Sequence, residues 1–200
     1  LQFKEFPFDL ALHIVCPEQA GYFTVTFKAL ELMDPRFAGK ERHVSYGLVQ
    51  LKEGKMSSRM GNVISGEWLL DETKRLLKKA FPKMSDETLE QVAVGAVKYS
   101  MLKVGLSQNI KFSFEESISL AGNSGPYLQY TFARTKSVLA KSATERENRA
   151  FSYDKMRIEV EEEQLLRTLH RFPQVVDDAT EHFAPNLLCN YLFDLTQEFN

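Results

Sequence analysis

The hydrophobic pattern of this 200-residue chain changes once, near residue 65, and does not change back. Before that point, an apolar run at 10–16 and an alternating run at 43–51 are typical of strands, and residues 19–33 between them have helical spacing. After it, the apolar segments repeat at helical spacing. The sequence therefore predicts a small α/β part followed by a mainly α-helical bundle, with helix dominating overall.

Local signals indicate where the later helices begin and end. Ser85 is a good N-cap, residues 113–116 have capping-box spacing, and Pro82 and Pro173 stop helices. Glycine and proline at 122–126 interrupt the next segment, and acidic residues 159–163 are expected to form a solvated helix face. We thus predict helices over 67–81, over 85–104, after 113, over 127–143, through 165–172, after 174 and from 185 to 199.

Composition indicates an ordinary globular chain, with 44% hydrophobic and 26% charged residues. The net charge is −2, so any nucleic-acid surface has to be a local patch. Cys16 and Cys189 are far apart and have no second cysteine nearby, which favours free thiols in a reducing cytoplasm over a disulfide or zinc site. No apolar run approaches the roughly 20 residues of a membrane span, so no membrane partner is expected.

The segment with the clearest chemical potential is Lys55-Met56-Ser57-Ser58-Arg59, which lies between Gly54 and Gly61. It follows a predicted strand and precedes a predicted helix, the position where open α/β sheets bind ligands. Its two cations and two hydroxyls suit a phosphate chain, and the glycines give the backbone freedom. Taken alone, such a cluster is more often a solvated surface loop.

This segment resembles the Lys-Met-Ser-Lys-Ser signature of class I aminoacyl-tRNA synthetases, in the form common among arginyl enzymes. Residues 13–19 (His-Ile-Val-Cys-Pro-Glu-Gln) are similar to the strand-then-Gln segment that precedes the signature. Residues 122–134 (Gly-Asn-Ser-Gly-Pro-Tyr-Leu-Gln-Tyr-Thr-Phe-Ala-Arg) closely resemble the block that opens the anticodon-binding domain of those enzymes. The chain is thereby identified as an internal part of a class I arginyl-tRNA synthetase.

The resemblance implies two domains. Residues 1–112 would be the C-terminal part of the catalytic domain, a remnant of a nucleotide-binding, Rossmann-like fold with the signature loop and connecting helices. Residues 113–200 would begin the helical anticodon-binding domain. The chain starts without Met and stops inside an apolar pattern, as expected of an internal piece. We expect the isolated chain to be inactive and able to self-associate through unpaired strand edges, and the full-length parent to be monomeric.

The resemblance also implies a chemistry. ATP, accompanied by Mg²⁺, would activate arginine to arginyl-adenylate, and the arginyl group would pass to tRNA-Arg, with positioning and electrostatics as the main catalytic effects. The implied catalytic residues are Lys55, Ser57, Ser58 and Arg59, and Met56 would pack the ATP-binding loop against the domain. Ser58 stands where the family pattern has a second lysine, so that lysine's role is not carried over. No metal site within the protein is expected.

Two further sets of residues follow from the resemblance. Gln19 matches a position that lines the arginine pocket, and its alternative role is to satisfy backbone groups at a helix start. The implied tRNA contacts are Tyr127, Gln129, Tyr130, Arg134 and Lys136, through phosphate contact or base stacking, with packing as the alternative for each tyrosine. His13 lacks the companions of an ATP-binding histidine signature and is expected to be structural.

Two other functions stay open at this point. The helical half could be a non-catalytic tRNA-binding module. The chain could also come from a class I synthetase of different specificity, such as a cysteinyl or lysyl enzyme, although the block at 122–134 argues against it.

Overall fold

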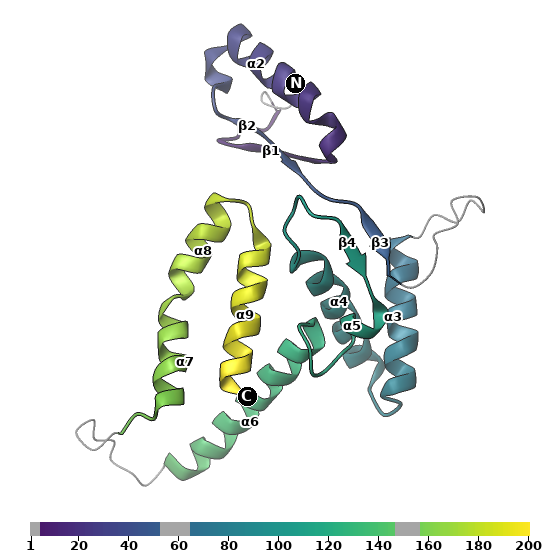
Figure 1. Cartoon of the computed structure of the whole chain (residues 1–200), viewed down its shortest axis with the longest axis vertical. Helices are drawn as coiled ribbons and strands as arrows, with labels where there is room; N and C mark the ends of the chain where they lie inside the picture. Colours follow the sequence, from purple (N-terminus) through teal and green to yellow (C-terminus); the bar gives the residue numbers. More distant parts are fainter. Residues whose placement is uncertain (1–4, 53–64, 147–156) are drawn as a thin grey trace. The chain divides into compact units, whose positions relative to one another are not determined.

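A computed structural model describes residues 5–52, 65–146 and 157–200, with side chains in the helix before the second gap described up to residue 142. These residues form two compact units (Figure 1). The first comprises Leu1–Gln50 and Gly105–Lys111, and the second comprises Leu51–Val104 and Phe112–Asn200. Helix dominates the described residues, as predicted.

The first unit is built on a strand, a helix and a second strand. β1 (Ala11–Val15) pairs in parallel with β2 (Glu41–Ser45), and α2 (Ala20–Met33) connects them (Figure 1). Short 3-10 turns, η1 (Pro17–Gln19) and η2 (Pro35–Phe37), lie before and after α2. A parallel pair needs such a crossover, so the α/β element predicted for the first fifty residues is confirmed.

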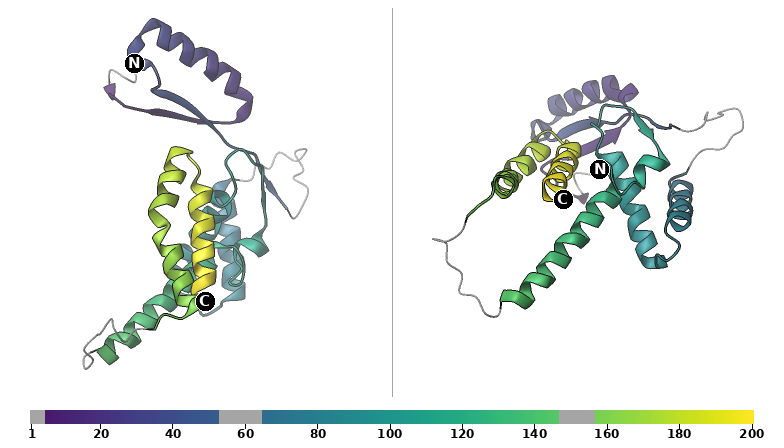
Figure 2. Two further views of the ribbon diagram at one scale, coloured as in Figure 1. Left: turned by 60° about the vertical axis from the view of Figure 1, so that its left-hand side comes forward. Right: turned by 60° about the horizontal axis from the view of Figure 1, so that its bottom comes forward.

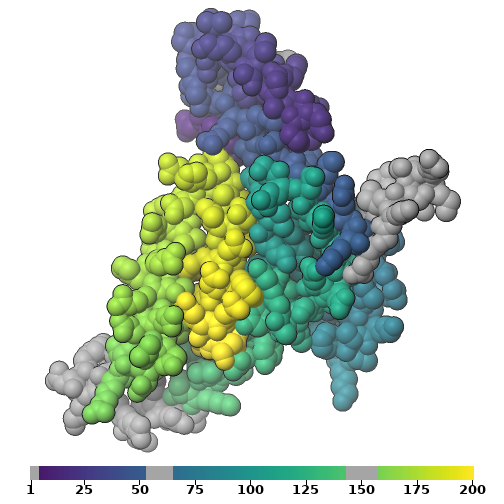
Figure 3. All heavy atoms as spheres, in the orientation of Figure 1, coloured from purple at the N-terminus to yellow at the C-terminus, as the bar shows by residue number. Residues whose placement is uncertain are grey.

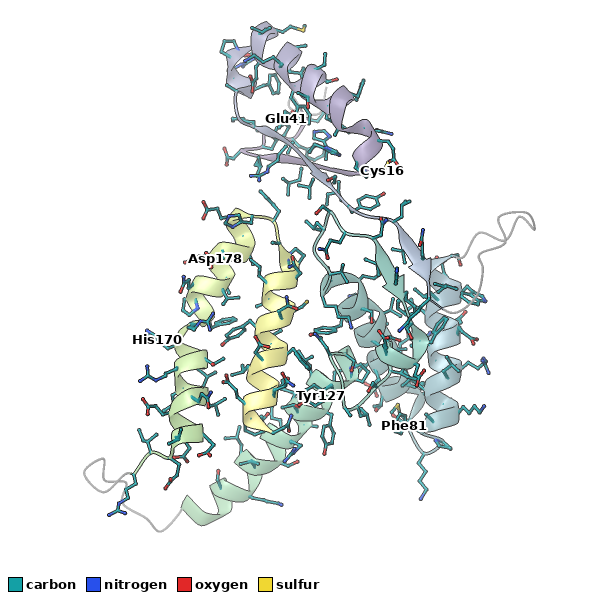
Figure 4. All side chains as sticks on the ribbon, in the orientation of Figure 1. Cys16, Glu41, Phe81, Tyr127, His170 and Asp178 are labelled. Carbon is teal, nitrogen blue, oxygen red and sulfur yellow. The ribbon has the colours of Figure 1, made fainter. Side chains whose placement is uncertain are left out.

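Aromatic rings hold α2 on this sheet. The His13 ring lies 5.2 Å from that of Phe23 and 5.1 Å from that of Phe27, and Phe23 stacks on His43 at 4.8 Å. The Nε2 atom of His13 is 2.6 Å from a carboxylate oxygen of Glu41, which Figure 4 labels. His13 is thus a packing residue between strand and helix, in agreement with its predicted structural role.

The single strand predicted over 43–51 is wrong, because the structure divides this segment into β2 and β3 (Val49–Leu51). Between them, the Gly47 N–H donates to the Leu106 carbonyl at 2.7 Å. A Cβ on Gly47 would lie 2.1 Å from the Gln108 carbonyl oxygen, so only glycine fits this close approach. The chain leaves the β1–β2 sheet here, and β3 pairs instead with β4 (Ile110–Phe112), a strand that the sequence did not predict.

The second unit begins with α3 (Gly66–Ala80) and α4 (Asp86–Leu102), close to their predicted bounds. The Ser85 hydroxyl accepts a hydrogen bond from the Thr88 N–H at 3.2 Å, which is the predicted N-cap. Leu77 of α3 is fully buried and packs with Leu89 and Ala93 of α4 in the core. The predicted helix after residue 113 is α5 (Phe114–Ser117), which is only four residues long.

Four longer helices complete this unit: α6 (Gly125–Arg146), α7 (Val160–His170), α8 (Phe172–Glu181) and α9 (Pro185–Phe199). α9 contacts α4 and α6 as well as α7 and α8, and Figure 3 shows it as a yellow layer between these groups. The second half of α6 projects away from the other helices of the unit (Figure 2). Glu159 and Glu162 form a capping box at the start of α7, so the acidic run opens a helix. Within the described ranges, no helix is long and apolar enough to cross a bilayer.

Two glycines let the backbones of α4 and α6 approach each other closely. A Cβ on Gly125 would lie 2.4 Å from the Gly95 carbonyl oxygen, and a Cβ on Gly95 would lie 2.6 Å from the Gln129 amide nitrogen. The Tyr99 hydroxyl strengthens the same region, because it donates to Asn123 Oδ1 at 2.6 Å and lies 3.1 Å from the Cys189 carbonyl of α9. These contacts fix the start of α6, which carries the predicted tRNA-binding residues.

Candidate functional site

The ATP-binding loop predicted at Lys55–Arg59 lies outside the residues that the structure describes. The structure does describe its flanks. β3 ends at Leu51, and the Lys52 N–H donates to the Phe112 carbonyl at 2.7 Å. On the other side, the Ser65 hydroxyl accepts from the Trp68 N–H at 3.2 Å and caps α3. The strand predicted before the segment and the helix predicted after it are therefore confirmed.

Gln19 lies directly after β1, at the carboxyl end of a parallel strand. It is exposed, and it precedes α2 as N-cap without making a side-chain capping hydrogen bond. Its backbone N–H bonds to the Cys16 carbonyl at 3.3 Å. At the start of α2, Gln19 therefore bonds through its backbone, and its side-chain amide does not cap the helix. The carboxyl end of a parallel sheet is where this fold class binds ligands.

On α6, the structure connects Tyr127 with Arg134 through the side chain of Asn200. The Asn200 amide nitrogen lies 3.2 Å from the Tyr127 hydroxyl and 2.7 Å from that of Thr131. Its oxygen accepts from Arg134 Nη1 at 2.6 Å. Tyr127 is half-buried, with its ring 5.8 Å from that of Phe193, so packing against α9 is its observed role. Sequence reasoning missed Asn200, since these three side-chain partners lie 66 or more residues away in the sequence.

Gln129 and Tyr130 are placed differently from each other, although they are neighbours in the sequence. The Gln129 amide donates to the Gln91 carbonyl of α4 at 3.1 Å, while its Oε1 atom is buried without a hydrogen-bond partner. Gln129 therefore serves the contact between α4 and α6. Tyr130 is 47% exposed, and the Arg134 guanidinium carbon lies 5.9 Å from its ring centre. This aromatic–cation pair is available at the surface.

Arg134 and Lys136 lie on different sides of α6. Successive residues of an α-helix are rotated by about 100° around its axis, so side chains two positions apart point in directions about 200° apart. Arg134 lies over Tyr130, whereas Lys136 Nζ lies 5.4 Å from the ring centre of Phe132. Both cations thus sit four residues after an aromatic ring. The structure does not bring them together on one surface, although the sequence predicted both as tRNA contacts.

An apolar cavity in the second unit does not suit phosphate chemistry. It has a volume of about 1100 Å³ and lies between α4, α6, α7 and α9. Its lining includes Phe81, Val92, Leu169 and Phe199, and none of the described lining residues is charged. This groove is therefore no candidate for the ATP site.

Comparison with known proteins shows which enzymes the chain resembles. Residues 128–200 match the family model of the DALR anticodon binding domain. Arginine–tRNA ligase of Bacteroides thetaiotaomicron is 34% identical over 100% of this chain, and that of Clostridium acetobutylicum is 34% identical over 98%. The chain is similar to these arginine–tRNA ligases over all or nearly all of its sequence. It covers 35% and 36% of these two relatives, so it spans about a third of their length.

Solved structures of the family have the same fold. Arginyl-tRNA synthetase of Thermus thermophilus superposes on 96% of this chain with a TM-score of 0.81 and 30% identity. The enzyme of Plasmodium falciparum superposes on 96% with a TM-score of 0.70 at 21% identity, which supports the fold alone. The chain corresponds to 32% and 34% of these two structures, respectively.

Proposed function

We propose that the protein containing this chain is an arginine–tRNA ligase. It activates arginine with ATP to arginyl-adenylate and transfers the arginyl group to tRNA-Arg. The observation that carries the proposal is the similarity to arginine–tRNA ligases, at 34% identity over 100% of the chain. ATP enters as a substrate, with Mg²⁺ bound to its phosphates, and the reaction takes place in the cytoplasm.

In this proposal residues 1–112 belong to the catalytic domain and residues 113–200 to the anticodon-binding domain. The β1–α2–β2 unit is the remnant of the nucleotide-binding sheet. Leu12 and Ile14 of β1 are 42% and 64% exposed, and they alternate with the half-buried His13 that packs under α2. In parallel sheets of this class both faces are normally covered by other elements, so both carry apolar side chains. The apolar face formed by Leu12 and Ile14, opposite α2, is consistent with such a sheet.

The signature loop supplies charge to the triphosphate. As the arginine carboxylate attacks the α-phosphorus, negative charge develops on the phosphate oxygens, and cations held nearby stabilise it. Lys55 makes the main phosphate contact in this proposal, and Ser57, Ser58 and Arg59 support it, while Met56 packs the loop. With Ser58 in place of a second lysine, Arg59 provides the additional positive charge.

Gln19 provides a contact to arginine. Its exposed position after β1 and its lack of a side-chain capping bond support this role. A neutral amide can both donate to a carboxylate or carbonyl and accept from a guanidinium or ammonium group.

The proposal is tested by measuring arginine-dependent ATP–pyrophosphate exchange on the full-length protein and on this 200-residue chain alone. We expect exchange at enzyme-like rates from the full-length protein. We expect none above background from the chain, because it spans only 35% of a related ligase. Exchange driven by cysteine or lysine would assign a different specificity, and a silent full-length protein would refute the proposal.

A second function, tRNA binding by the helical unit without chemistry, is favoured by the match of residues 128–200 to the anticodon binding domain. For this function we predict that Arg134→Gln weakens binding of tRNA-Arg. Loss of one phosphate contact on a folded RNA reduces the slope of log affinity against log salt by about 0.7–0.9. Fluorescence titration of the variant and wild type at several salt concentrations measures this slope.

One variant controls this measurement. Lys28→Gln removes a cation from the first unit, where Lys28 pairs with Glu31. Lys28→Gln is expected to leave the slope unchanged. If Arg134→Gln and Lys28→Gln behave alike, Arg134 makes no phosphate contact.

A further inference from the structure

The side chain of Asn200 connects the end of α9 with α6, which lies beside it (Figure 1). Its amide nitrogen donates to the Thr196 carbonyl of its own helix at 2.8 Å and to the Thr131 hydroxyl of α6 at 2.7 Å. Its amide oxygen accepts from Arg134 Nη1 at 2.6 Å. Asn200 therefore joins the end of α9 to an exposed arginine of α6.

The neighbours of Asn200 determine which way its amide faces. A carbonyl can only accept a hydrogen bond and a guanidinium can only donate one. The amide nitrogen therefore has to face Thr196, and the amide oxygen has to face Arg134. The side chain of Thr131, which contacts the same nitrogen, belongs to a residue that is only 3% exposed. The acceptor that holds Arg134 is thus itself fixed on the packed side of α6.

The partner of Arg134 is neutral, unlike the partners of three other arginines in the described residues. Arg36, Arg75 and Arg167 each pair with a carboxylate, whose negative charge offsets that of the guanidinium. None of the ion pairs between described residues includes Arg134. An amide oxygen holds the guanidinium without cancelling its charge, and one bond occupies one of its five N–H donors. Arg134 is therefore held in place and still able to bind an anion.

From these contacts we propose that Asn200 is a positioning residue for tRNA binding, which holds Arg134 over the ring of Tyr130 for contact with a tRNA phosphate. This inference rests on the proposed binding of tRNA by the helical unit. The Arg134 guanidinium carbon lies 5.9 Å from the centre of the Tyr130 ring. The ring contact and the hydrogen bond together restrict the rotamers of Arg134, so less side-chain freedom is lost when a phosphate binds.

Asn200→Ala in the full-length protein should weaken binding of a tRNA-Arg transcript by about two- to tenfold, the ordering cost of one long side chain. The slope of log affinity against log salt should stay at the wild-type value, because Arg134 keeps its charge and still reaches the phosphate. Arg134→Gln, in contrast, should reduce that slope. Asn200 is exposed at the end of α9, so the variant keeps the buried core intact. Fluorescence titration at several salt concentrations measures affinity and slope.

A double variant separates positioning from structural support. In the Arg134→Gln background, Asn200→Ala should cause no further loss of affinity, because the side chain that Asn200 positions is already gone. Thr168→Val is the matched control, since it removes the hydrogen bond at 3.0 Å from the Thr168 hydroxyl to Glu198, near the same end of α9. It leaves Asn200 and Arg134 in place, so tRNA should bind as it does to wild type.

The outcomes distinguish this inference from the function on which it rests. Wild-type affinity of Asn200→Ala, or an equal loss with and without Arg134, overturns the positioning role while tRNA binding through Arg134 stands. A wild-type salt slope in Arg134→Gln overturns the contact through which Asn200 acts. A full-length protein that does not bind tRNA-Arg overturns the proposed tRNA binding itself.

Discussion

A Gly125→Ala variant should lower the free energy of unfolding of the second unit by about 3 kcal/mol, the upper end for overpacking a tight contact. A Cβ at this position would lie 2.4 Å from the Gly95 carbonyl oxygen and 3.0 Å from the Ala96 nitrogen. Both are backbone atoms of α4, so the clash cannot be relieved by rotating a side chain. The two helices have to separate, and the helix contacts around them loosen. Urea unfolding followed by circular dichroism measures the change.

The matched control for this variant is Gly66→Ala. Gly66 opens α3 in the same unit, as Gly125 opens α6, but a Cβ on it meets nothing within 4 Å. Alanine is a better helix former than glycine and restricts the unfolded chain, so the control should be neutral or stabilising by up to about 1 kcal/mol. Equal destabilisation by both substitutions would show that the close contact of α4 with α6 is not what Gly125 provides.

The helix predictions are confirmed where residues close in the sequence decide the structure. Ser85 accepts the Thr88 N–H at the start of α4, and Pro185 stands at the first position of α9. Such signals act over one turn of helix, so they can be read without knowing the rest of the fold. The capping box at Glu159 has the same local character, but the sequence pattern was interpreted as a solvated helix face and the cap was missed.

The strand predictions were wrong where contacts between distant residues decide the structure. β3 and β4 have three residues each, too few for an alternating pattern to stand out, and they form because residues about 60 positions apart bond to one another. The Leu48 N–H, for example, donates to the Asn109 side chain at 2.8 Å. Likewise, the contact of Gln129 with Gln91 depends on the α4–α6 crossing, which no local pattern reveals.

In the candidate site, too, the sequence located the residues, and contacts with distant residues decided their surroundings. Motif resemblance located Gln19 and the α6 residues, and the structure then distinguished their surroundings. It assigned Gln129 to a helix contact, coupled Arg134 to Asn200, and set Lys136 apart beside Phe132. Only the loop at Lys55–Arg59 rests on sequence alone, so its proposed role depends on substitution experiments.

Lys55→Ala in the full-length protein should reduce kcat for arginine activation by about 100- to 1000-fold, the usual cost of losing one group that stabilises transition-state charge. The KM for arginine should change little, because the proposed contact is with phosphate. β3 ends at Leu51 and α3 begins at Gly66, so the substitution changes no residue of either element and the melting temperature should match wild type. Pyrophosphate exchange under saturating arginine and ATP measures kcat.

Three comparisons make this prediction specific. Lys55→Arg keeps the charge and should recover part of the lost rate, although a guanidinium does not reproduce the compact ammonium. Lys83→Ala removes an exposed lysine between α3 and α4 and should leave the rate unchanged. Transfer of arginine from preformed arginyl-adenylate to tRNA involves no triphosphate, so it should be much less sensitive to Lys55→Ala than activation is. A loss of equal size in both steps would mean that Lys55 acts on the whole active site and not on the phosphates of ATP.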